Sequence, residues 1–393
     1  MSEPAGHYPL AGIRVVALEQ AVAAPMCTRH LADLGADVIK LERPVGGDFA
    51  RHYDSAVRGQ SAYFAWLNRG KRSVELDLKS PDGAETLSRL LETADVFIYN
   101  LAPGVIDRLG LTRTTIQSKW PRLITCAISG YGPDGPYSDR KAYDLLLQGE
   151  AGVLAVTGTE DQPAKAGISI ADICAAMYAL SSILVALYDH ERTGEGAFID
   201  LSMFECLTEW MMAPLYHELY AGKAPPREGM RHNMISPYGP FRAADGSLVN
   251  LAIHTERQWL SLCDSVLELP DLARDSRFAS NELRVAHRDE LEPMIERRLS
   301  TMQSDAIERK LEQADIPFGH VNSLADLVEH PQLRARARWI EVDTEAGPIK
   351  ALANPFNIHG MPRARGRVPR PGEHTKEVLE QLNNLERKPS RNA

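Results

Sequence analysis

Short β-branched runs alternate with amphipathic stretches through the first half of the chain. Stretches with the apolar spacing of a helix, such as 25–34 and 82–94, stand between several of these runs. The apolar runs that predict strands are 13–18, 37–42, 72–78, 95–100, 123–129 and 196–203. Strands that alternate with helices predict an α/β fold with a mostly parallel sheet that is covered on both faces.

The second half follows a different pattern. Residues 222–240 are rich in glycine and proline, which indicates a connector, and 241–253 are typical of a hairpin around Asp245 and Gly246. Helical spacing continues from 256 to about 314. The predicted organisation is a large domain, a linker, a smaller α+β domain, and a segment that returns to the large domain, at 1–205, 206–225, 226–325 and 326–393.

Composition narrows the class of protein. The 393 residues contain 44 Lys and Arg and 53 Asp and Glu, and the net charge of −9 argues against nucleic acid as the main partner. The N-terminus lacks the pattern of a signal peptide, so we expect a cytoplasmic protein with reduced thiols. No zinc signature occurs, and the cysteines have no metal-like spacing, at Cys27, Cys126, Cys174, Cys206 and Cys263.

One carboxylate stands at the start of the longest apolar segment. Asp172 precedes the run 173–188, which is apolar nearly all round and shorter than the ~20 residues that span a bilayer, so a buried helix is expected. Ser169 and Asp172 have the spacing of a capping box, and a helix start favours an ionised acid. The local spacing favours a simple cap. Poor hydration at such a place also makes Asp172 a candidate for nucleophilic or acid–base chemistry.

Three familiar signatures fail on inspection. Gly130, Gly132 and Gly135 satisfy G-x-G-x-x-G, yet a proline follows where a helix should open. Ser129 lacks the glycines of a nucleophile elbow, and the segment around Lys71 lacks the first glycine of a P-loop. These motifs therefore give no support for a dinucleotide site, a serine hydrolase or a P-loop enzyme.

Several short segments, in this order, resemble the class III CoA-transferase family. They are VAAP (22–25), GADVIKLERP (35–44), NRGKRS (68–73), NLAPGVIDRLG (100–110), SGYGPDGPY (129–137), KAYD (141–144), Asp172, RTGEG (192–196) and PGEHTKEVL (371–379). The family includes formyl-CoA and carnitine-CoA transferases and shares its fold with α-methylacyl-CoA racemase. The resemblance implies a Rossmann-like large domain, a small domain and an interlocked homodimer.

The resemblance also implies roles for particular residues. The family's catalytic aspartate matches Asp172, which shifts the balance from a cap to catalysis. The positions that match the family's CoA contacts are Val22, Ala23, Arg43, Arg69, Gly70, Lys71, Arg72, Asn100, Leu101, Ala102, Arg108, Lys141 and Tyr143. Arginine and lysine suit the diphosphate and ribose phosphate of CoA, although any one of them, taken singly, is more often a solvated surface group.

Two substitutions separate this chain from named branches. Val22 stands where the formyl-CoA branch has a glutamine, so a hydrogen bond near the reacting carbonyl is lost. The racemases carry a histidine directly before the aspartate of the KAYD segment, whereas this chain has Tyr143 before Asp144. A neutral tyrosine is a poor base near pH 7, so the transferase is favoured, with an acyl-CoA racemase or epimerase as the alternative. A non-catalytic CoA-binding protein is a third hypothesis.

The predicted reaction is covalent transfer of CoA through an aspartyl-CoA thioester on Asp172, with acyl-CoA as a substrate and no prosthetic group or metal. We expect succinyl-CoA or a similar donor. Arg231, His232 and Asn233 lie in the connector, where related enzymes shape the acid-binding end, and a guanidinium could hold a second carboxylate. The predicted acceptor is a dicarboxylate such as succinate, itaconate, mesaconate or citramalate; hydrated loop residues are the alternative interpretation of these three.

Overall fold

The computed structural model describes residues 7–363 and 366–386, which form two compact units. Unit 1 contains 7–151, 166–212 and the C-terminal part from 333. Unit 2 contains 152–165 and 213–332. The segment 152–165, which the sequence placed in the large domain, therefore belongs with the second unit.

A six-stranded parallel sheet forms the centre of unit 1, in the order β3-β2-β1-β4-β5-β6. Its strands are β1 (Arg14–Leu18), β2 (Asp37–Glu42), β3 (Arg72–Glu75), β4 (Val96–Tyr99), β5 (Ile124–Ser129) and β6 (Phe198–Ser202). Every predicted strand of the first half is present. The order reverses between β1 and β4, as in doubly wound folds, so the α/β fold class with a mostly parallel sheet is confirmed.

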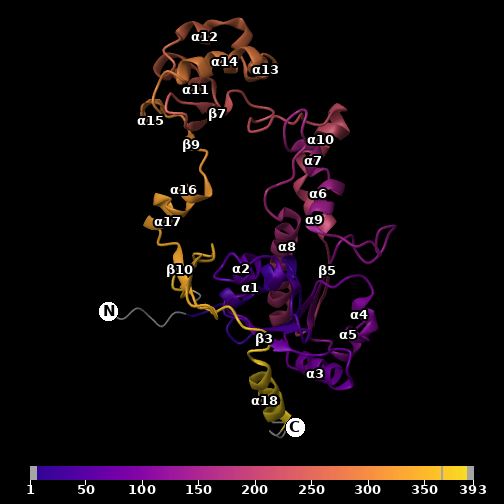
Figure 1. Ribbon diagram of the computed structural model, residues 1–393. Helices are drawn as coiled ribbons and strands as arrows, with labels where there is room; N and C mark the ends of the chain where they lie inside the picture. Colours follow the sequence, from indigo (N-terminus) through magenta and orange to yellow (C-terminus); the bar gives the residue numbers. More distant parts are fainter. Residues whose placement is uncertain (1–6, 364–365, 387–393) are drawn as a thin grey trace. The chain divides into compact units, whose positions relative to one another are not determined.

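Helices cover both faces of this sheet (Figure 1). The helices α1 (Ala23–Asp33), α8 (Ile170–Thr193) and α9 (Met203–Trp210) pack on one face. The other face carries α3 (Pro81–Glu92), α5 (Arg113–Lys119) and α18 (Thr375–Glu386). Alternate strand residues such as Val16 and Phe97 are fully buried against the second group. Burial on both faces explains why the strands read as continuous apolar runs.

Helix α8 has 24 residues and is longer than the predicted apolar run. It is the one helix in the described part of the chain that is long and apolar enough to cross a membrane. Its first half packs on α1, β5 and β6, with Cys174, Ala175 and Ala176 fully buried. Further along, Val185 and Tyr188 are exposed by more than two thirds. We therefore describe α8 as a core helix of unit 1 whose second half has an uncovered apolar side.

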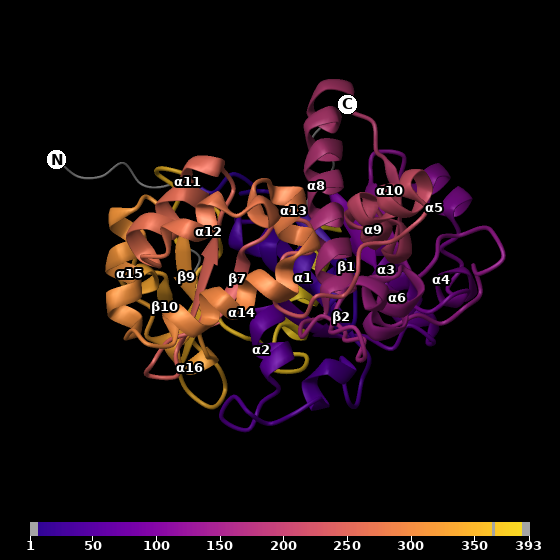
Figure 2. The ribbon, with the colours of Figure 1, turned by 90° about the horizontal axis from the view of Figure 1, so that it is seen from above.

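Unit 2 has its own sheet and core (Figure 2). The strands β7 (Tyr238–Arg242) and β8 (Leu248–Ala252) form the predicted hairpin, and β9 (Phe318–His320) pairs with β8. The helices around them are α11 (Glu256–Ser261), α12 (Pro270–Arg274), α13 (Asn281–Ala286), α14 (Arg288–Leu299) and α15 (Ser304–Gln313), with the short turns η2 (Leu262–Val266) and η3 (Ser276–Phe278). Trp259 and Phe278 are completely buried among them.

The C-terminal segment returns to unit 1 and covers the free edge of β3. Gly372 N donates to Ser73 Oγ (2.9 Å), and His374 N donates to the Ser73 carbonyl (2.9 Å). A covered edge strand cannot pair with another chain. The remaining elements are η1 (Phe49–His52), α2 (Ala62–Asn68), α4 (Val105–Arg108), α6 (Asp144–Glu150), α7 (Val153–Val156), α10 (Met212–Ala221), α16 (Leu324–Val328), α17 (Pro331–Ala335), β10 (Trp339–Val342) and β11 (Ile349–Leu352).

Candidate active site

Asp172 lies in the first turn of α8, but it does not cap that helix. The N-cap residue Ser169 makes no side-chain hydrogen bond to the helix start, so the predicted capping box is absent. The cap comes instead from α6, where Asp144 Oδ1 accepts from Ala171 N (2.8 Å) and from Asp172 N (3.4 Å). Because Asp144 satisfies these amides, the simple-cap interpretation of Asp172 loses its support.

The environment of Asp172 disfavours its charged form. The carboxyl group is half-buried, and burial together with the nearby Asp144 carboxylate raises its pKa to about 7. A hydrogen-bonding interaction with the backbone N–H of Ala23 opposes this rise in pKa. Ala23 begins α1, so Asp172 lies at the N-terminal end of a second helix, where the helix dipole favours negative charge. Near pH 7 the group is therefore divided between acid and carboxylate.

Two tyrosines share these surroundings. Burial and the carboxylates of Asp48 and Asp172 raise the pKa of Tyr53 to about 12, and Tyr143 contributes to the same shift. Tyr143 precedes α6, and its side chain is 64% exposed. A phenol hydroxyl can donate a hydrogen bond. The predicted residue Tyr143 thus lies in the region of Asp172, whereas Tyr53 was not identified from the sequence.

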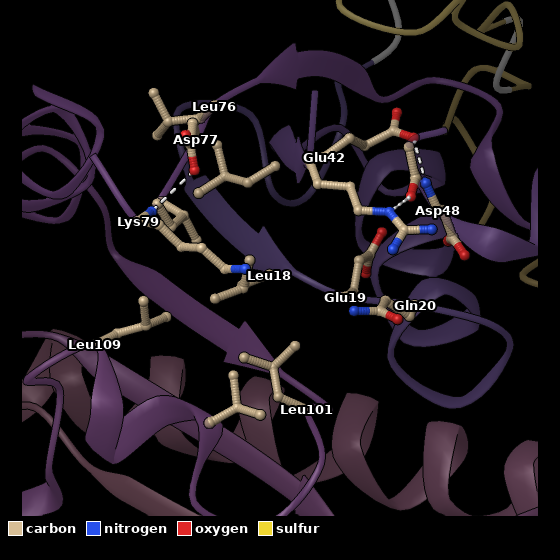
Figure 3. Close-up of a pocket in the computed structure, with 15 residues that line it drawn as sticks. Leu18, Glu19, Gln20, Glu42, Asp48, Leu76, Asp77, Lys79, Leu101 and Leu109 are labelled. Carbon is tan, nitrogen blue, oxygen red and sulfur yellow. Dashed lines mark hydrogen bonds between the residues drawn. The ribbon is translucent and has the colours of Figure 1, made fainter. Parts of the chain in front are cut away.

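A pocket of about 260 Å³ opens at the carboxyl edge of the same sheet (Figure 3). It lies where β1, β2 and β3 end and includes residues that follow β4, at the point where strand order reverses. Open α/β sheets bind ligands at this place. The lining residues are Leu18, Glu19, Gln20, Leu41, Glu42, Arg43, Gly47, Asp48, Leu76, Asp77, Leu78, Lys79, Leu101, Val105 and Leu109.

The pocket combines an apolar wall with cationic side chains. Leucines from the strand ends point into it, with Glu19, Gln20 and Asp48 on another side, as Figure 3 shows. Arg43 is exposed, and its Nε donates to the Gly47 carbonyl (3.1 Å). Lys79 is exposed too and extends into the pocket. This arrangement suits a ligand with a flat apolar part and phosphate groups.

Arg69 and Lys71 do not present their charges to this pocket. Arg69 is 3% exposed and binds Asp33 through Nε (3.1 Å) and Nη2 (2.8 Å). All three donors of the Lys71 ammonium are used, by Glu19 Oε1 (2.7 Å), the Pro25 carbonyl (2.9 Å) and Asn68 Oδ1 (3.0 Å). The Lys71 ammonium has no donor left for a phosphate, and the buried Arg69 guanidinium is held by Asp33, so the described contacts give no support for a phosphate contact by either side chain.

Arg72 and Gly70 also face the scaffold. Arg72 forms an ion pair with Asp37 and a hydrogen bond to Gln381 Oε1 (2.9 Å) on α18. Gly70 has φ +79° and donates to the Arg367 carbonyl (2.8 Å), and a Cβ added at Gly366 would meet Gly70 Cα at 2.2 Å, so the two segments lie in close contact. Residues 69–72 thus connect the C-terminal segment to the sheet. Contact between the Arg72 side chain and CoA stays a prediction.

The other predicted CoA residues have different surroundings. Leu101 lines the pocket, and Asn100 next to it bonds the backbone of Gln20 in both directions (2.9 and 2.8 Å). Ala102, Arg108 and Lys141 are exposed, whereas Val22 and Ala23 are buried at the start of α1. CoA contact by these residues and by Arg43 stays a prediction.

The predicted acid-binding residues belong to unit 2. Arg231 donates to Glu228 Oε2 (2.6 Å) and Glu292 Oε2 (3.1 Å) and lies 3.5 Å from Asp289 Oδ1. Three acids already surround this guanidinium, so it pairs within unit 2, and its role in holding a substrate carboxylate stays a prediction. His232 stacks on Tyr238 with the ring planes 9° apart, and Asn233 is half-buried. Roles for these two residues in binding stay predictions.

Sequence reasoning missed the segment after β3. Leu76, Asp77, Leu78 and Lys79 line the pocket, four to ten positions beyond the predicted residues 69–72. The end of the third predicted strand could have identified this segment, because ligands bind beyond the carboxyl ends of parallel strands. Asp144 was noted only as the neighbour of Tyr143. Within 7–363 and 366–386, no group of three or more His, Cys, Asp or Glu side chains is placed to hold a metal ion.

Comparison with known proteins identifies the class that this fold and this site define. The model of CoA-transferase family III matches residues 10–375, so the chain belongs to that family. It is 36% identical to the succinate–glutarate CoA-transferase of Agrobacterium fabrum, over 96% of this chain and 97% of the relative. An acetyl-CoA:oxalate CoA-transferase of Acetobacter aceti is 36% identical, over 90% of each chain.

A solved structure has the same fold. The CaiB/BaiF family protein of Brucella suis superposes with a TM-score of 0.85 at 35% identity, over 95% of this chain and 99% of that one. The resemblance found in the sequence is thereby confirmed. The protein is an enzyme of the CoA-transferase class, and enzymes of this class use CoA thioesters as substrates.

Proposed function

We propose that this enzyme moves CoA from an acyl-CoA donor to a dicarboxylic acid through a thioester on Asp172. The observation that carries this proposal is the environment of Asp172. Its carboxyl group is half-buried and has a pKa of about 7, and it does not cap α8 because Asp144 does so instead. A carboxylate placed in this way is a candidate nucleophile. Its position at the start of α1 adds donors that favour negative charge during the reaction.

The proposed steps balance without ATP. The Asp172 carboxylate attacks the donor thioester carbon, the C–S bond breaks, and a mixed anhydride and CoA thiolate result. The thiolate attacks the aspartyl carbonyl, and the donor acid leaves as a carboxylate. The acceptor carboxylate then attacks the aspartyl thioester and releases the thiolate, which attacks the acceptor carbonyl and frees Asp172. Each bond to an acyl carbon is exchanged for another, so no net proton is consumed.

The pocket at the sheet edge suits the nucleotide end of CoA. Its leucines provide an apolar surface for a base, and Arg43 and Lys79 can neutralise phosphates. The loop between β1 and α1 connects this pocket, through Gln20, to Ala23 beside Asp172. A CoA bound along this loop would bring its thioester to the acid.

A dicarboxylic acceptor is supported by the relatives, whose names contain succinate, glutarate and oxalate. Arg231 is not the proposed contact, because it already pairs with Glu228 and Glu292. Succinyl-CoA is the proposed donor, and acetyl-CoA is the alternative that one relative's name suggests. A panel of monocarboxylates and dicarboxylates offered with succinyl-CoA tests the class; turnover restricted to monocarboxylates would reject it.

A homodimer is proposed as well. The side chains of Val185 and Tyr188 on α8 and of Leu219 and Tyr220 on α10 are more than 60% exposed. Apolar surface of this extent needs a cover in a soluble enzyme, and a second copy of the chain, interlocked as the family resemblance implies, can provide it. A cytoplasmic location stays a prediction.

Mass spectrometry after incubation with succinyl-CoA is the direct test. A CoA adduct that hydroxylamine removes is expected on the peptide containing Asp172, and Asp172→Ala should lose both adduct and turnover while it still binds CoA. Full transferase activity in that variant would refute the assignment. An acyl-CoA racemase would instead exchange the α-hydrogen with D₂O without any acceptor acid.

A further inference from the structure

The loop between β1 and α1 has an unusual backbone. Ala21 has φ +60°, a left-handed conformation that residues with a Cβ rarely adopt. Val22 follows as the N-cap residue of α1, and Ala23 begins the helix. A strained residue persists only when its neighbours hold it. Contacts from neighbouring residues must therefore hold Ala21 in this conformation.

Two side chains hold this loop. Asn100 accepts from Gln20 N (2.9 Å) and donates to the Gln20 carbonyl (2.8 Å). One position further on, Ala21 N donates to Asp48 Oδ1 (3.2 Å). Asp48 is thus the group that bonds the strained residue itself.

Asp48 is fixed by its own partners. Its Oδ1 also accepts from Ala50 N (2.9 Å), and its Oδ2 accepts from Lys40 Nζ (2.8 Å). Both side chains of the Lys40–Asp48 pair are completely buried, and Lys40 Nζ lies 3.3 Å from Glu19 Oε1. Both oxygens of Asp48 accept hydrogen bonds from protein donors, so we attribute its effect on the reaction to the loop, although Asp48 also lines the pocket.

We propose that Asp48 is a positioning residue for the transfer reaction: it holds Ala21 in the left-handed conformation that turns the first amides of α1 towards Asp172. The inference rests on the proposed role of Asp172 as the group that carries CoA. Negative charge develops on the Asp172 acyl oxygen in the two steps that attack the aspartyl carbonyl, and amides fixed in advance stabilise that charge without reorganisation. Without the Asp48 contact, the first amides of α1 are still present, but they no longer point towards Asp172.

The test compares four variants in the full-length enzyme. Asp48→Ala should lower kcat about 10²-fold while KM for the acyl-CoA changes far less. Asp48→Ala combined with Ala21→Gly should recover about tenfold of that loss, since glycine adopts a positive φ without strain. Ala21→Val, which leaves the buried charges intact, should lower kcat because a β-branched residue resists this backbone.

A matched control is Asp33→Ala. Asp33 is equally buried and paired, with Arg29 (2.9 Å) and Arg69 (2.8 Å), but it has no contact with the loop. Asp33→Ala should lower the melting temperature without changing the pH at which the rate falls on the acid side of its pH dependence. Asp48→Ala should move this acid-side fall to higher pH, because the Ala23 amide that lowers the pKa of Asp172 is withdrawn.

Three results would overturn the inference: no rescue by glycine at position 21, full kcat in Ala21→Val, or a change confined to KM for the acyl-CoA. The last result would mean that Asp48 acts on acyl-CoA binding, as a residue that lines the pocket, and not on the loop. The proposed function is judged separately, by the adduct and by Asp172→Ala, so its failure is distinguishable from failure of the positioning role.

Discussion

Asp172 differs from the other buried acids of unit 1 in its partners. Glu19, Asp33 and Asp48 each pair with lysine or arginine. Within the described residues no cation pairs with Asp172, and the nearest charge that affects it is that of Asp144. Unpaired burial raises the pKa of an acid, whereas a paired acid keeps its charge. Pairing with a cation therefore distinguishes the acids that stabilise the fold from Asp172, the candidate reactive acid.

The pH dependence of turnover follows from this pKa. In the proposed mechanism the carboxylate is the nucleophile, so activity should rise with pH through about 7 and level off above it. Two units below that midpoint only about 1% of the groups are ionised, so kcat/KM at pH 5 should be roughly a hundredth of its plateau. Steady-state rates with succinyl-CoA between pH 5 and 9 measure it. A midpoint near 4 would contradict the environment described for Asp172.

Two arginines offer a matched comparison of binding and scaffold roles. Arg43→Gln should raise KM for the CoA thioester about tenfold with little loss of stability, because a charged contact to phosphate is worth ~1.5 kcal/mol or more. Arg69→Gln should leave that KM nearly unchanged and lower the free energy of unfolding by about 3 kcal/mol, since Asp33 loses a buried partner. Urea titration and initial rates measure both. The opposite pattern would restore Arg69 as a ligand residue.

At the scale of elements, the sequence predicted most of the sheet and its helices. The apolar runs became β1 to β6 because strands of a parallel sheet are buried on both faces, which leaves a strong pattern. The capping box failed because spacing reports only near neighbours. The residue that caps α8, Asp144, is 28 positions before Asp172. A contact from another helix can replace a local one without any trace in the local sequence.

Helix α8 can be tested through this cap. Asp144→Ala removes the cap and the charge, and it should destabilise the protein by about 1 kcal/mol and lower the pKa of Asp172. Asp144→Asn keeps an acceptor for Ala171 N but removes the charge, so it should lower the same pKa at a smaller cost in stability. Thermal melts and rate profiles of the two variants separate these effects. An unchanged acid limb in both would show that Asp144 does not influence Asp172.

At the scale of the whole molecule, the chain divides into two units whose boundaries depend on contacts between distant segments. The sequence placed a connector near 222–240, but nothing local indicated that 152–165 belong with 213–332. In the structure, Arg227 donates to the carbonyls of Thr159 and Glu160 and so joins these two segments. Such pairings are set by tertiary structure, which composition does not report.

The proposed homodimer gives a prediction at this scale. Sedimentation should give a mass of twice 43.5 kDa. Val185→Lys places a charge on the exposed apolar side of α8 and should weaken association, whereas Leu260→Lys on α11, an exposed leucine of unit 2, serves as the control. A wild-type enzyme that sediments as a monomer at assay concentration would reject the dimer.

The sequence by itself determined the order of strands and helices, the family and the identity of Asp172 as the candidate acid. These depend on apolar periodicity and on motifs that lie close together along the chain. Tertiary structure decided which charged groups are available. Arg69, Lys71 and Arg231 are cations in the sequence, but Asp33, Glu19 and Glu228 occupy them in the fold. Ionisation and availability depend on neighbours in space, and for that reason only the folded chain reveals them.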